Sequence, residues 1–493
     1  LTITGPGSRV EVVSNSLGLA PGVPDNFNPF VAIGYDSGSP GQLSISNGGQ
    51  LLLTGNALST PTDTRVTALH IGGRSNTSAN HLGSASVSGT GSQILLNGAD
   101  ALINVGRGPG SVGTLDVTSG GHVGSISLVV GAFGNGSVSL DGGSIALSGQ
   151  RTDSTNVGAG MTIGRGTGGV GVMTLANGSS LSFQNNGTLD IGFSVGGDGF
   201  ASGGTGTLLV SGGSSITLAG SVGGGASIGR TGSGTLTLSG NSLLDVGSNR
   251  SIYVGRDAAG SGALSVFSGS SVNAGYVGVG STTGGDTGGG ALLVVDNSSL
   301  TATTLEIGTT GMLSGDEGTI NANVLNRGIL SPGNSPGRII INGGFHNLVG
   351  GRLVLDVDEV AGEFQVDHLV LTAGSSFGFD DVTVTFNFIG DTDPEAFAAS
   401  GGFDLDNFIQ SSDSNGNVSG LSTVFEPDAS WETVFASAQF EAASPTYDVT
   451  QLSLTQDGSF GVVAVPVPEP QTVILWLAGL GLLSAVRLLQ RRR

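Results

Sequence analysis

An aliphatic residue followed by glycine recurs ten times in this chain, and this repeat constrains the fold more than any other feature. Successive pairs lie 25 to 38 residues apart. The pairs are Ile33-Gly34, Ile71-Gly72, Val105-Gly106, Val130-Gly131, Ile163-Gly164, Ile191-Gly192, Ile228-Gly229, Val254-Gly255, Val279-Gly280 and Ile307-Gly308. A fixed element that returns at this interval is typical of stacked units, each too small to bury its own apolar face.

Each pair is followed by a glycine-rich stretch, an alternating segment and a small polar turn. Residues 235–240 (TLTLSG) and 114–121 (TLDVTSGG) show this pattern. Alternation of apolar and polar residues predicts strands with one buried face. Helical repeats are excluded because the chain has 91 glycines, and each glycine inside a helix costs about 1 kcal/mol relative to alanine.

Unit length separates the two remaining β architectures. A β-propeller blade needs four strands in ~40 or more residues, whereas the shortest units here have 25, close to one coil of a parallel β-helix. We therefore predict an all-β fold, with a right-handed parallel β-helix (solenoid) over residues 1–388. Ten coils with ~4.8 Å between neighbours would form a rod of about 50 Å.

Residues 389–464 are predicted to form an acidic, Phe-rich cap on the solenoid. Between residues 353 and 464 there are 19 acidic residues and no arginine, and 13 of the 20 phenylalanines lie between Phe345 and Phe460. Residues 382–388 favour a strand, and residues 394–399 and 405–410 allow short helices. A solenoid needs such a cap, because its last coil otherwise exposes an apolar interior and an unpaired strand edge.

Residues 465–493 predict a membrane address in three parts: a rigid tripeptide, an apolar helix and a basic end. The helix over residues 473–489 would reach about 25 Å, slightly short of a ~30 Å hydrocarbon core. Arg487 would extend toward the headgroups, and the terminal arginines would stay in the cytoplasm, so the body of the protein is expected to be exported. The residues of the tripeptide and the basic end are Pro468, Glu469, Pro470, Arg491, Arg492 and Arg493. Because residue 1 is Leu and no leader precedes it, a removed or missing signal peptide is expected.

This tail resembles the PEP-CTERM sorting signal of Gram-negative bacteria. The resemblance implies recognition by exosortase, a membrane-embedded cysteine protease, and delivery to an exopolysaccharide-rich cell surface. The helix would anchor the chain in the membrane before processing. The alternative is an ordinary single-span anchor preceded by a proline linker, and both interpretations require export.

The repeats are also similar to those shared by autotransporter passengers and PEP-CTERM proteins. Residues 331–337 (SPGNSPG), followed by a strand, strengthen this resemblance. An autotransporter would end in a membrane barrel of many ten-residue strands, and the segment between the repeats and the tail is too short for one.

The pattern of ionisable residues predicts no catalytic or metal site. Asp356, Asp358 and Glu359 invite comparison with paired-carboxylate glycoside hydrolysis, but alternation predicts that Asp356 and Asp358 share a solvated face. Asp413, Asn415 and Asn417 have the spacing of a calcium loop without its glycine and its final glutamate. The chain has no cysteine, and its five histidines lack ligand spacing. No cofactor is expected.

Four arginines directly follow an aliphatic–Gly pair: Arg107, Arg165, Arg230 and Arg256. Stacking would place them on one side of the rod, as a ladder for acidic sugars or for the acidic segment of a neighbouring molecule. The alternative is that they are ordinary exposed turn residues. The formal net charge of −21 argues against a nucleic-acid partner.

These features predict a non-enzymatic structural or adhesive protein of the cell surface, held in extracellular polysaccharide. A surface polysaccharide-degrading enzyme, either a glycoside hydrolase or a lyase built on a β-helix, is the alternative.

Overall fold

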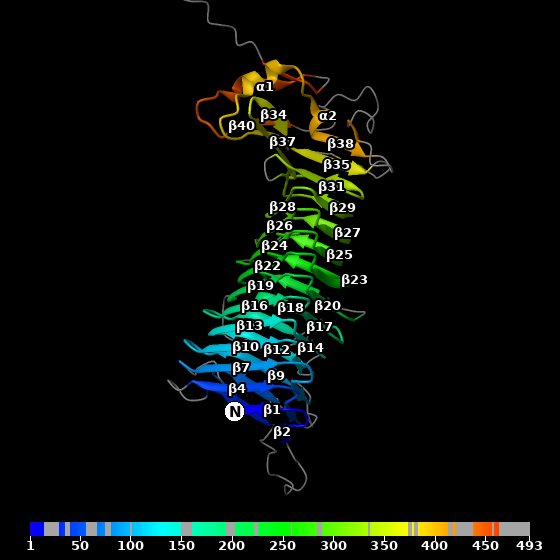
Figure 1. Ribbon diagram of the computed structural model, residues 1–493. Helices are drawn as coiled ribbons and strands as arrows, with labels where there is room; N and C mark the ends of the chain where they lie inside the picture. The colour runs from blue at the N-terminus through cyan, green and yellow to red at the C-terminus, as the bar shows by residue number, and fades with distance from the viewer. Residues whose placement is uncertain are drawn as a thin grey trace, which may run out of the picture.

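The computed structural model of the chain is a rod of stacked strands with a small cap at the end opposite the N-terminus (Figure 1). It describes residues 1–462 except 14–28, 35–39, 56–66, 74–79, 99–100, 149–159, 194–202, 221–224, 258, 283–287, 334–335, 373–376, 379–382, 413–417, 421–436 and 456–457.

The first sheet is one long column that runs the length of the rod. Among the described residues it has sixteen strands, of which only β34 (Glu363–Val366) lies off the column, antiparallel to β33. All the others pair in parallel with the strand one coil away. In order they are β1 (Thr2–Thr4), β4 (Gly41–Ser46), β7 (Leu82–Ser88), β10 (Val112–Thr118), β13 (Asn135–Asp141), β16 (Val170–Ala176), β19 (Thr205–Val210), β22 (Ser233–Leu238), β24 (Ser261–Val266), β26 (Gly289–Val294), β28 (Gly311–Gly315), β30 (Ile329–Pro332), β33 (Arg352–Val360), β37 (Thr383–Phe388) and β40 (Ser437–Ala442).

The second sheet carries two further columns, so that each coil contributes three strand segments. The second column contains β2 (Arg9–Val13), β5 (Gln50–Thr54), β8 (Gln93–Asn97), β11 (His122–Ser125), β14 (Ser144–Leu147), β17 (Ser180–Phe183), β20 (Ser215–Leu218), β31 (Arg338–Ile341), β35 (His368–Thr372) and β38 (Ile409–Ser412). The third contains β3 (Phe30–Ile33), β6 (Ala68–Ile71), β9 (Leu102–Arg107), β12 (Ser127–Ala132), β15 (Met161–Arg165), β18 (Leu189–Phe193), β21 (Gly225–Ile228), β32 (Phe345–Asn347) and β36 (Phe377–Gly378). Four long strands run through both columns: β23 (Leu243–Val254), β25 (Ser271–Val279), β27 (Ser299–Ile307) and β29 (Gly318–Asn326).

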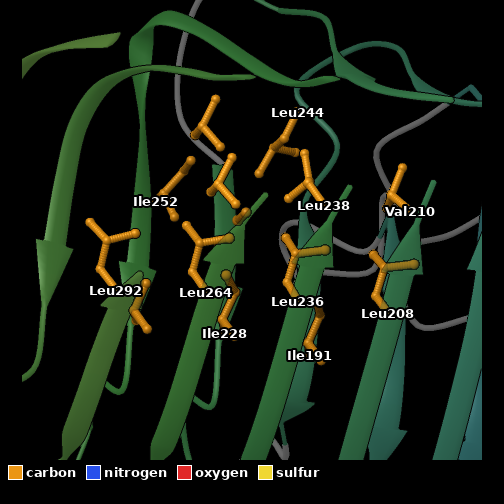
Figure 2. Packing of buried hydrophobic residues seen from close by; sticks show 14 of the residues in the cluster. Ile191, Leu208, Val210, Ile228, Leu236, Leu238, Leu244, Ile252, Leu264 and Leu292 are labelled. Carbon is orange, nitrogen blue, oxygen red and sulfur yellow. The ribbon is translucent and has the colours of Figure 1, made fainter. Parts of the chain in front are cut away.

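The core is a set of aliphatic ladders in which each residue lies on its counterpart in the next coil. Leu208, Leu236, Leu264 and Leu292 pair in sequence along the first column (Figure 2). All four are at most 1% exposed. Because alternation sends every second side chain inward, keeping the register over many coils produces one continuous apolar interior.

The aliphatic–Gly pairs form a corner of each of the ten coils from Ile33 to Ile307. The aliphatic members pair coil to coil in one ladder from Ile33 to Ile307. Gly229 shows why the second member is glycine: its φ is +67°, and a Cβ there would lie 1.9 Å from the carbonyl oxygen of Ser261. Only a residue without a side chain fits both the left-handed conformation and the close approach of the next coil.

A ladder of buried serines lies at the turns that follow the strands of the first column, at the other end of these strands from the aliphatic–Gly corner. The Ser214 hydroxyl donates to the carbonyl oxygen of Ser211 at 2.7 Å and accepts the backbone N–H of Ser179 at 3.1 Å. Ser179 makes the equivalent bonds to Ala176 and Gly143. The Ser214 hydroxyl adds a second hydrogen bond to turn groups that are already paired through the backbone, and these hydroxyls link each turn to the next.

The cap covers the last coils with short elements (Figure 1). Its phenylalanines pack against the core of the solenoid. Its elements are α1 (Pro394–Ser400), α2 (Leu405–Phe408), β39 (Val418–Gly420), the 3-10 helix Val449–Gln451, and the hairpin of β41 (Leu452–Leu454) and β42 (Phe460–Val462). Asp393 caps α1 by accepting from the N–H groups of Glu395 and Ala396, and Gly401 ends it in the left-handed conformation. Phe397, 1% exposed, lies 4.8 to 6.4 Å from five other phenylalanine rings.

The prediction of a mostly-β parallel solenoid is confirmed, and the short helices predicted near residues 394–399 and 405–410 are present as α1 and α2. The described part of the first column extends from β1 to β40, beyond the ten units recognised in sequence. With fifteen strands it is roughly 65–70 Å long. The right-handed winding and the division at residue 389 remain predictions.

Candidate binding face

The residues that follow the aliphatic–Gly pairs form a row along the outer edge of the third column. Arg107, Ala132, Arg165 and Phe193 pair in sequence from one coil to the next. The guanidinium of Arg230 then lies 4.8 Å from the centre of the Phe193 ring. The structure therefore brings the four arginines of the predicted ladder to one edge of the rod.

In the middle of the rod this row widens into a band that we call the aromatic–arginine strip. Asp257 lies at its centre: its carboxylate is 3.0 Å from Nε of Arg230 and 3.5 Å from Nε of Arg256. The guanidinium of Arg256 lies 4.5 Å from the centre of the Tyr253 ring. The members of the strip are Asp190, Phe193, Arg230, Tyr253, Arg256, Asp257, Tyr276, Glu306 and Arg327.

The strip continues over three further coils, because Gly278 has no side chain and so leaves room for the ring of Tyr276. Tyr253 pairs with Gly278, and Gly278 pairs with Glu306. The ring of Tyr276 lies over Gly278, where a Cβ would approach the ring to 3.0 Å. From there Tyr276 reaches Tyr253, with 5.7 Å between ring centres, and donates its hydroxyl to Glu306 Oε2 at 2.9 Å. Glu306 also pairs with Arg327.

Charges within the strip balance. It contains three arginines and three carboxylates, and each arginine has a carboxylate neighbour. Burial raises the pKa of Asp190 to about 6, against the effects of the Arg230 charge and of hydrogen bonds from Thr188 and Ser227. Burial also raises the pKa of Tyr276 to about 12, so this hydroxyl stays protonated and available to donate.

Such a surface can bind an extended polar chain. The side chains of Arg230, Arg256 and Arg327 are 36 to 41% exposed, so their remaining N–H groups reach solvent. Guanidinium forks and carboxylates donate to and accept from hydroxyls, and the aromatic faces offer flat apolar contact. Because the charges cancel, the strip suits an uncharged or weakly acidic ligand better than a strongly charged one.

Some of the carboxylates around the segment compared with glycoside hydrolases have structural roles. The expectation of a solvated Asp356 is wrong: the residue is 6% exposed and accepts a hydrogen bond from Asn387 at 2.8 Å, because β37 covers it. Its backbone N–H donates to Asp367, which is fully buried and also accepts from Gly337. Among the described residues no group of three or more His, Asp or Glu side chains could hold a metal ion. Asp413, Asn415 and Asn417 lie outside the described residues.

Sequence reasoning missed Arg250. This residue is 2% exposed and donates to the carbonyl oxygens of Ala219 and Gly187, in the two preceding coils. It lies in β23 where the pairing register shifts. A single arginine within a polar stretch gives no sequence signal that it points inward.

Comparison with known protein families concerns the tail. Residues 466–493 match the family model for the PEP-CTERM protein-sorting motif. The chain carries a PEP-CTERM sorting signal. PEP-CTERM proteins are exported and sorted to the cell surface by exosortase, so this chain is an exosortase substrate with a parallel β-rich body. No curated protein matches the chain.

The match covers the tail and not the repeats, so their similarity to autotransporter passengers remains a prediction. The motif residues Pro468, Glu469 and Pro470 and the predicted membrane helix at 473–489 lie outside the described residues. Within the described part of the chain, no helix has the length and apolar character needed to cross a membrane.

Proposed function

We propose that this PEP-CTERM protein is a non-enzymatic surface scaffold that adheres to extracellular polysaccharide through the aromatic–arginine strip. The observation that carries the proposal is the strip itself, in which paired arginines and aromatic rings alternate over consecutive coils. A rigid solenoid holds these groups at a spacing set by the ~4.8 Å rise between coils. A polysaccharide repeats the same sugar units, so several units can contact groups on successive coils at once. The individually weak contacts then give a higher overall affinity.

The surface of the coils fits the same role. Between residues 1 and 352 there are 17 acidic residues and 12 arginines. The outward positions of the strands are largely serine, threonine and asparagine, as in residues 84–88 (SASVS) and 235–239 (TLTLS). Hydroxyl and amide groups hydrogen-bond to sugar hydroxyls with little electrostatic preference.

Retention on immobilised exopolysaccharide tests the proposal. We expect Arg230→Gln combined with Arg256→Gln to weaken retention of the full-length chain about tenfold, the equivalent of 1.4 kcal/mol. The matched control is Arg9→Gln, because Arg9 is also exposed and ion-paired, with Glu11 at 3.0 Å, but lies in the first coil. Equal retention of the double variant and the control would contradict the proposal.

The same incubation tests the non-enzymatic character. We expect the size distribution of the polysaccharide to stay unchanged over the time needed for binding, as measured by size-exclusion chromatography with light scattering. Chain shortening that depends on the protein would instead favour the polysaccharide-degrading alternative.

Sorting is tested separately in cells. Replacement of Glu469 by Gln, or deletion of residues 472–493, is expected to abolish delivery to the surface, because both remove features of the matched motif. The measurement is surface labelling and cell fractionation. Unchanged surface attachment after either change would refute exosortase-dependent sorting.

A further inference from the structure

A second potential binding site lies where the solenoid meets its cap. A cavity of about 400 Å³ opens there, within the range of small-molecule sites. The solenoid side comes from Asp316 and Glu317, at the turn between β28 and β29, and from Arg338 and His368, which begin β31 and β35. The opposite side comes from Phe364, in β34 of the first sheet, and from Phe403, between α1 and α2 of the cap. None of these residues belongs to the aromatic–arginine strip.

The aromatic wall is rigid. The rings of Phe364 and Phe403 meet edge to face, with 6.3 Å between centres. Behind them, the buried ring of Phe397 stacks on Phe403 at 4.8 Å and meets Phe364 at 5.3 Å. A ligand therefore meets an angled apolar wall that is already in place, which reduces the entropic cost of binding.

The polar wall is held by the solenoid backbone. The backbone N–H of Arg338 donates to Asp316 Oδ1 at 3.3 Å, and its guanidinium lies 3.9 Å from Glu317 Oε2. His368 Nδ1 lies 2.7 Å from the carbonyl oxygen of Asn407, which ties β35 to α2. Donors and acceptors of both kinds thus face the aromatic rings across the cavity.

Glu317 occupies a tight turn of the coil. Its φ is +54°, a left-handed conformation that costs a residue with a Cβ roughly 1 kcal/mol. The equivalent turns of the two preceding coils are also left-handed, at Ser268 and Gly269 and at Asp296 and Asn297, and the backbone N–H groups of Gly269 and Asn297 each donate to the turn of the next coil. At the last of these turns the conformation brings the Glu317 carboxylate to the cavity.

We infer that this cavity binds a single uncharged sugar unit, with the C–H face of a pyranose ring on the Phe403 ring and its rim against Phe364. The ring hydroxyls would bond to Asp316, Glu317 and Arg338. An apolar wall opposite planar hydrogen-bonding groups matches a molecule that has an apolar face and a polar rim. Since one guanidinium accompanies two carboxylates, an acidic sugar is excluded by like-charge repulsion. The inference does not depend on the role of the strip.

Ligand-observed NMR on the full-length chain tests this site. The probes are the methyl glycosides of glucose, galactose, glucosamine and glucuronic acid at ~10 mM, where binding with a Kd near 1 mM is readily detected. We expect saturation transfer to at least one neutral hexoside and none to the glucuronide. Absence of signal from both neutral hexosides, or a stronger signal from the glucosaminide, would overturn the inference.

Variants locate the binding. Phe403→Leu removes the flat face at similar volume, and Glu317→Gln removes the carboxylate but keeps the size; each is expected to weaken hexoside binding about tenfold. Glu363→Gln is the matched control, because this neighbour of Phe364 is exposed and does not line the cavity. Arg9→Gln, outside both sites, should leave hexoside binding unchanged. Loss of hexoside binding in the Arg230→Gln and Arg256→Gln pair, with no loss in Phe403→Leu, would place the bound sugar on the strip instead and overturn the inference, so failure of this site and failure of the strip are distinguishable. Unaltered binding in both Phe403→Leu and Glu317→Gln would refute the assignment.

Discussion

The solenoid and its cap solve the same problem, exclusion of water from an apolar interior, in opposite ways. In the solenoid, small aliphatic residues repeat in register, as from Leu208 to Leu292, and each contact is copied from the coil below. In the cap, Phe397, Phe403 and Phe408 pack with neighbouring rings at different angles, from stacked to edge to face. Repetition requires a uniform side-chain size, whereas termination requires residues that fill an irregular space.

This difference predicts which substitutions destabilise the solenoid and which destabilise the cap. The solenoid depends on positions where a side chain cannot be added, because its coils approach closely. The cap depends on positions where volume cannot be removed.

The largest effect is expected at the glycine corner. Gly229→Ala would force a left-handed conformation on alanine and place Cβ 1.9 Å from the carbonyl oxygen of Ser261, so we expect a loss of more than about 4 kcal/mol. Hydrogen exchange measured by mass spectrometry should show lost protection in the coils on both sides. The control is Gly289→Ala, two coils further on, where φ is not left-handed and no atom lies within 4 Å of the added Cβ. A similar loss in the control would mean that the corner is not special.

Next in size is the loss of a central ring of the cap. Phe397→Ala is expected to cost about 3–5 kcal/mol, because the ring is buried and its neighbours cannot fully close the space. Exchange should rise in α1 and β42 and stay unchanged in coils near β16. If protection fell along the whole rod instead, the solenoid and cap would be one cooperative unit.

A pH effect of intermediate size should also distinguish the two regions. Burial raises the pKa of Asp367 to about 8, further raised by Asp356 and Asp316, although backbone N–H groups of Asp356 and Gly337 oppose the shift. The unfolded chain loses this proton near pH 4 and the folded protein near pH 8, so the contribution of Asp367 to stability is complete below pH 4 and falls as the pH rises to 8. We expect exchange at the last coils to accelerate over that range, and Asp367→Asn to flatten the dependence. An unchanged pH profile in Asp367→Asn would show that another group titrates.

The smallest predicted effect is a difference in stability loss between alanine substitutions of two buried serines of the solenoid. Ser214→Ala removes two hydrogen bonds, although the Ser179 N–H keeps the Ala176 carbonyl as acceptor and the Ser211 carbonyl keeps the Ser214 N–H as donor, so the change should cost about 1 kcal/mol. Ser298→Ala should cost less than about 0.5 kcal/mol, because the Ser298 hydroxyl is buried and has no hydrogen-bond partner in the described structure. Equal losses in thermal melts would contradict this reading of the serine ladder.

Much of the solenoid could be predicted because its determinants are local. The period-two pattern assigns strands and their buried faces, and the aliphatic–Gly pairs mark the same point in each coil, as the ladder from Ile33 to Ile307 shows. Coils beyond Ile307 were not recognised as units, because Asn326 takes the position of the aliphatic residue in the next coil. The coil still stacks with asparagine at this position, but the aliphatic–Gly pattern in the sequence is interrupted there.

The sites were harder to predict because they are assembled from distant segments. The cavity where the solenoid meets its cap is lined by residues from four separate segments that show no common spacing: 316–317, 336–338, 364–368 and 403–407. The strip was found in part, through Arg230 and Arg256, whereas its tyrosines were missed. Tyr276 enters the strip by crossing over Gly278, and that contact depends on side-chain geometry rather than on sequence period.

The register of the coils has an evolutionary consequence. From Ile33 to Ile307 the strands of a column meet their neighbours through the same alternation and the same glycine corner, although the units range from 25 to 38 residues in length. A duplication or deletion of one whole unit would therefore join surfaces that already match. Genes for such proteins can lengthen or shorten by recombination between repeats, so the reach of the molecule from the cell can be inherited as a variable trait.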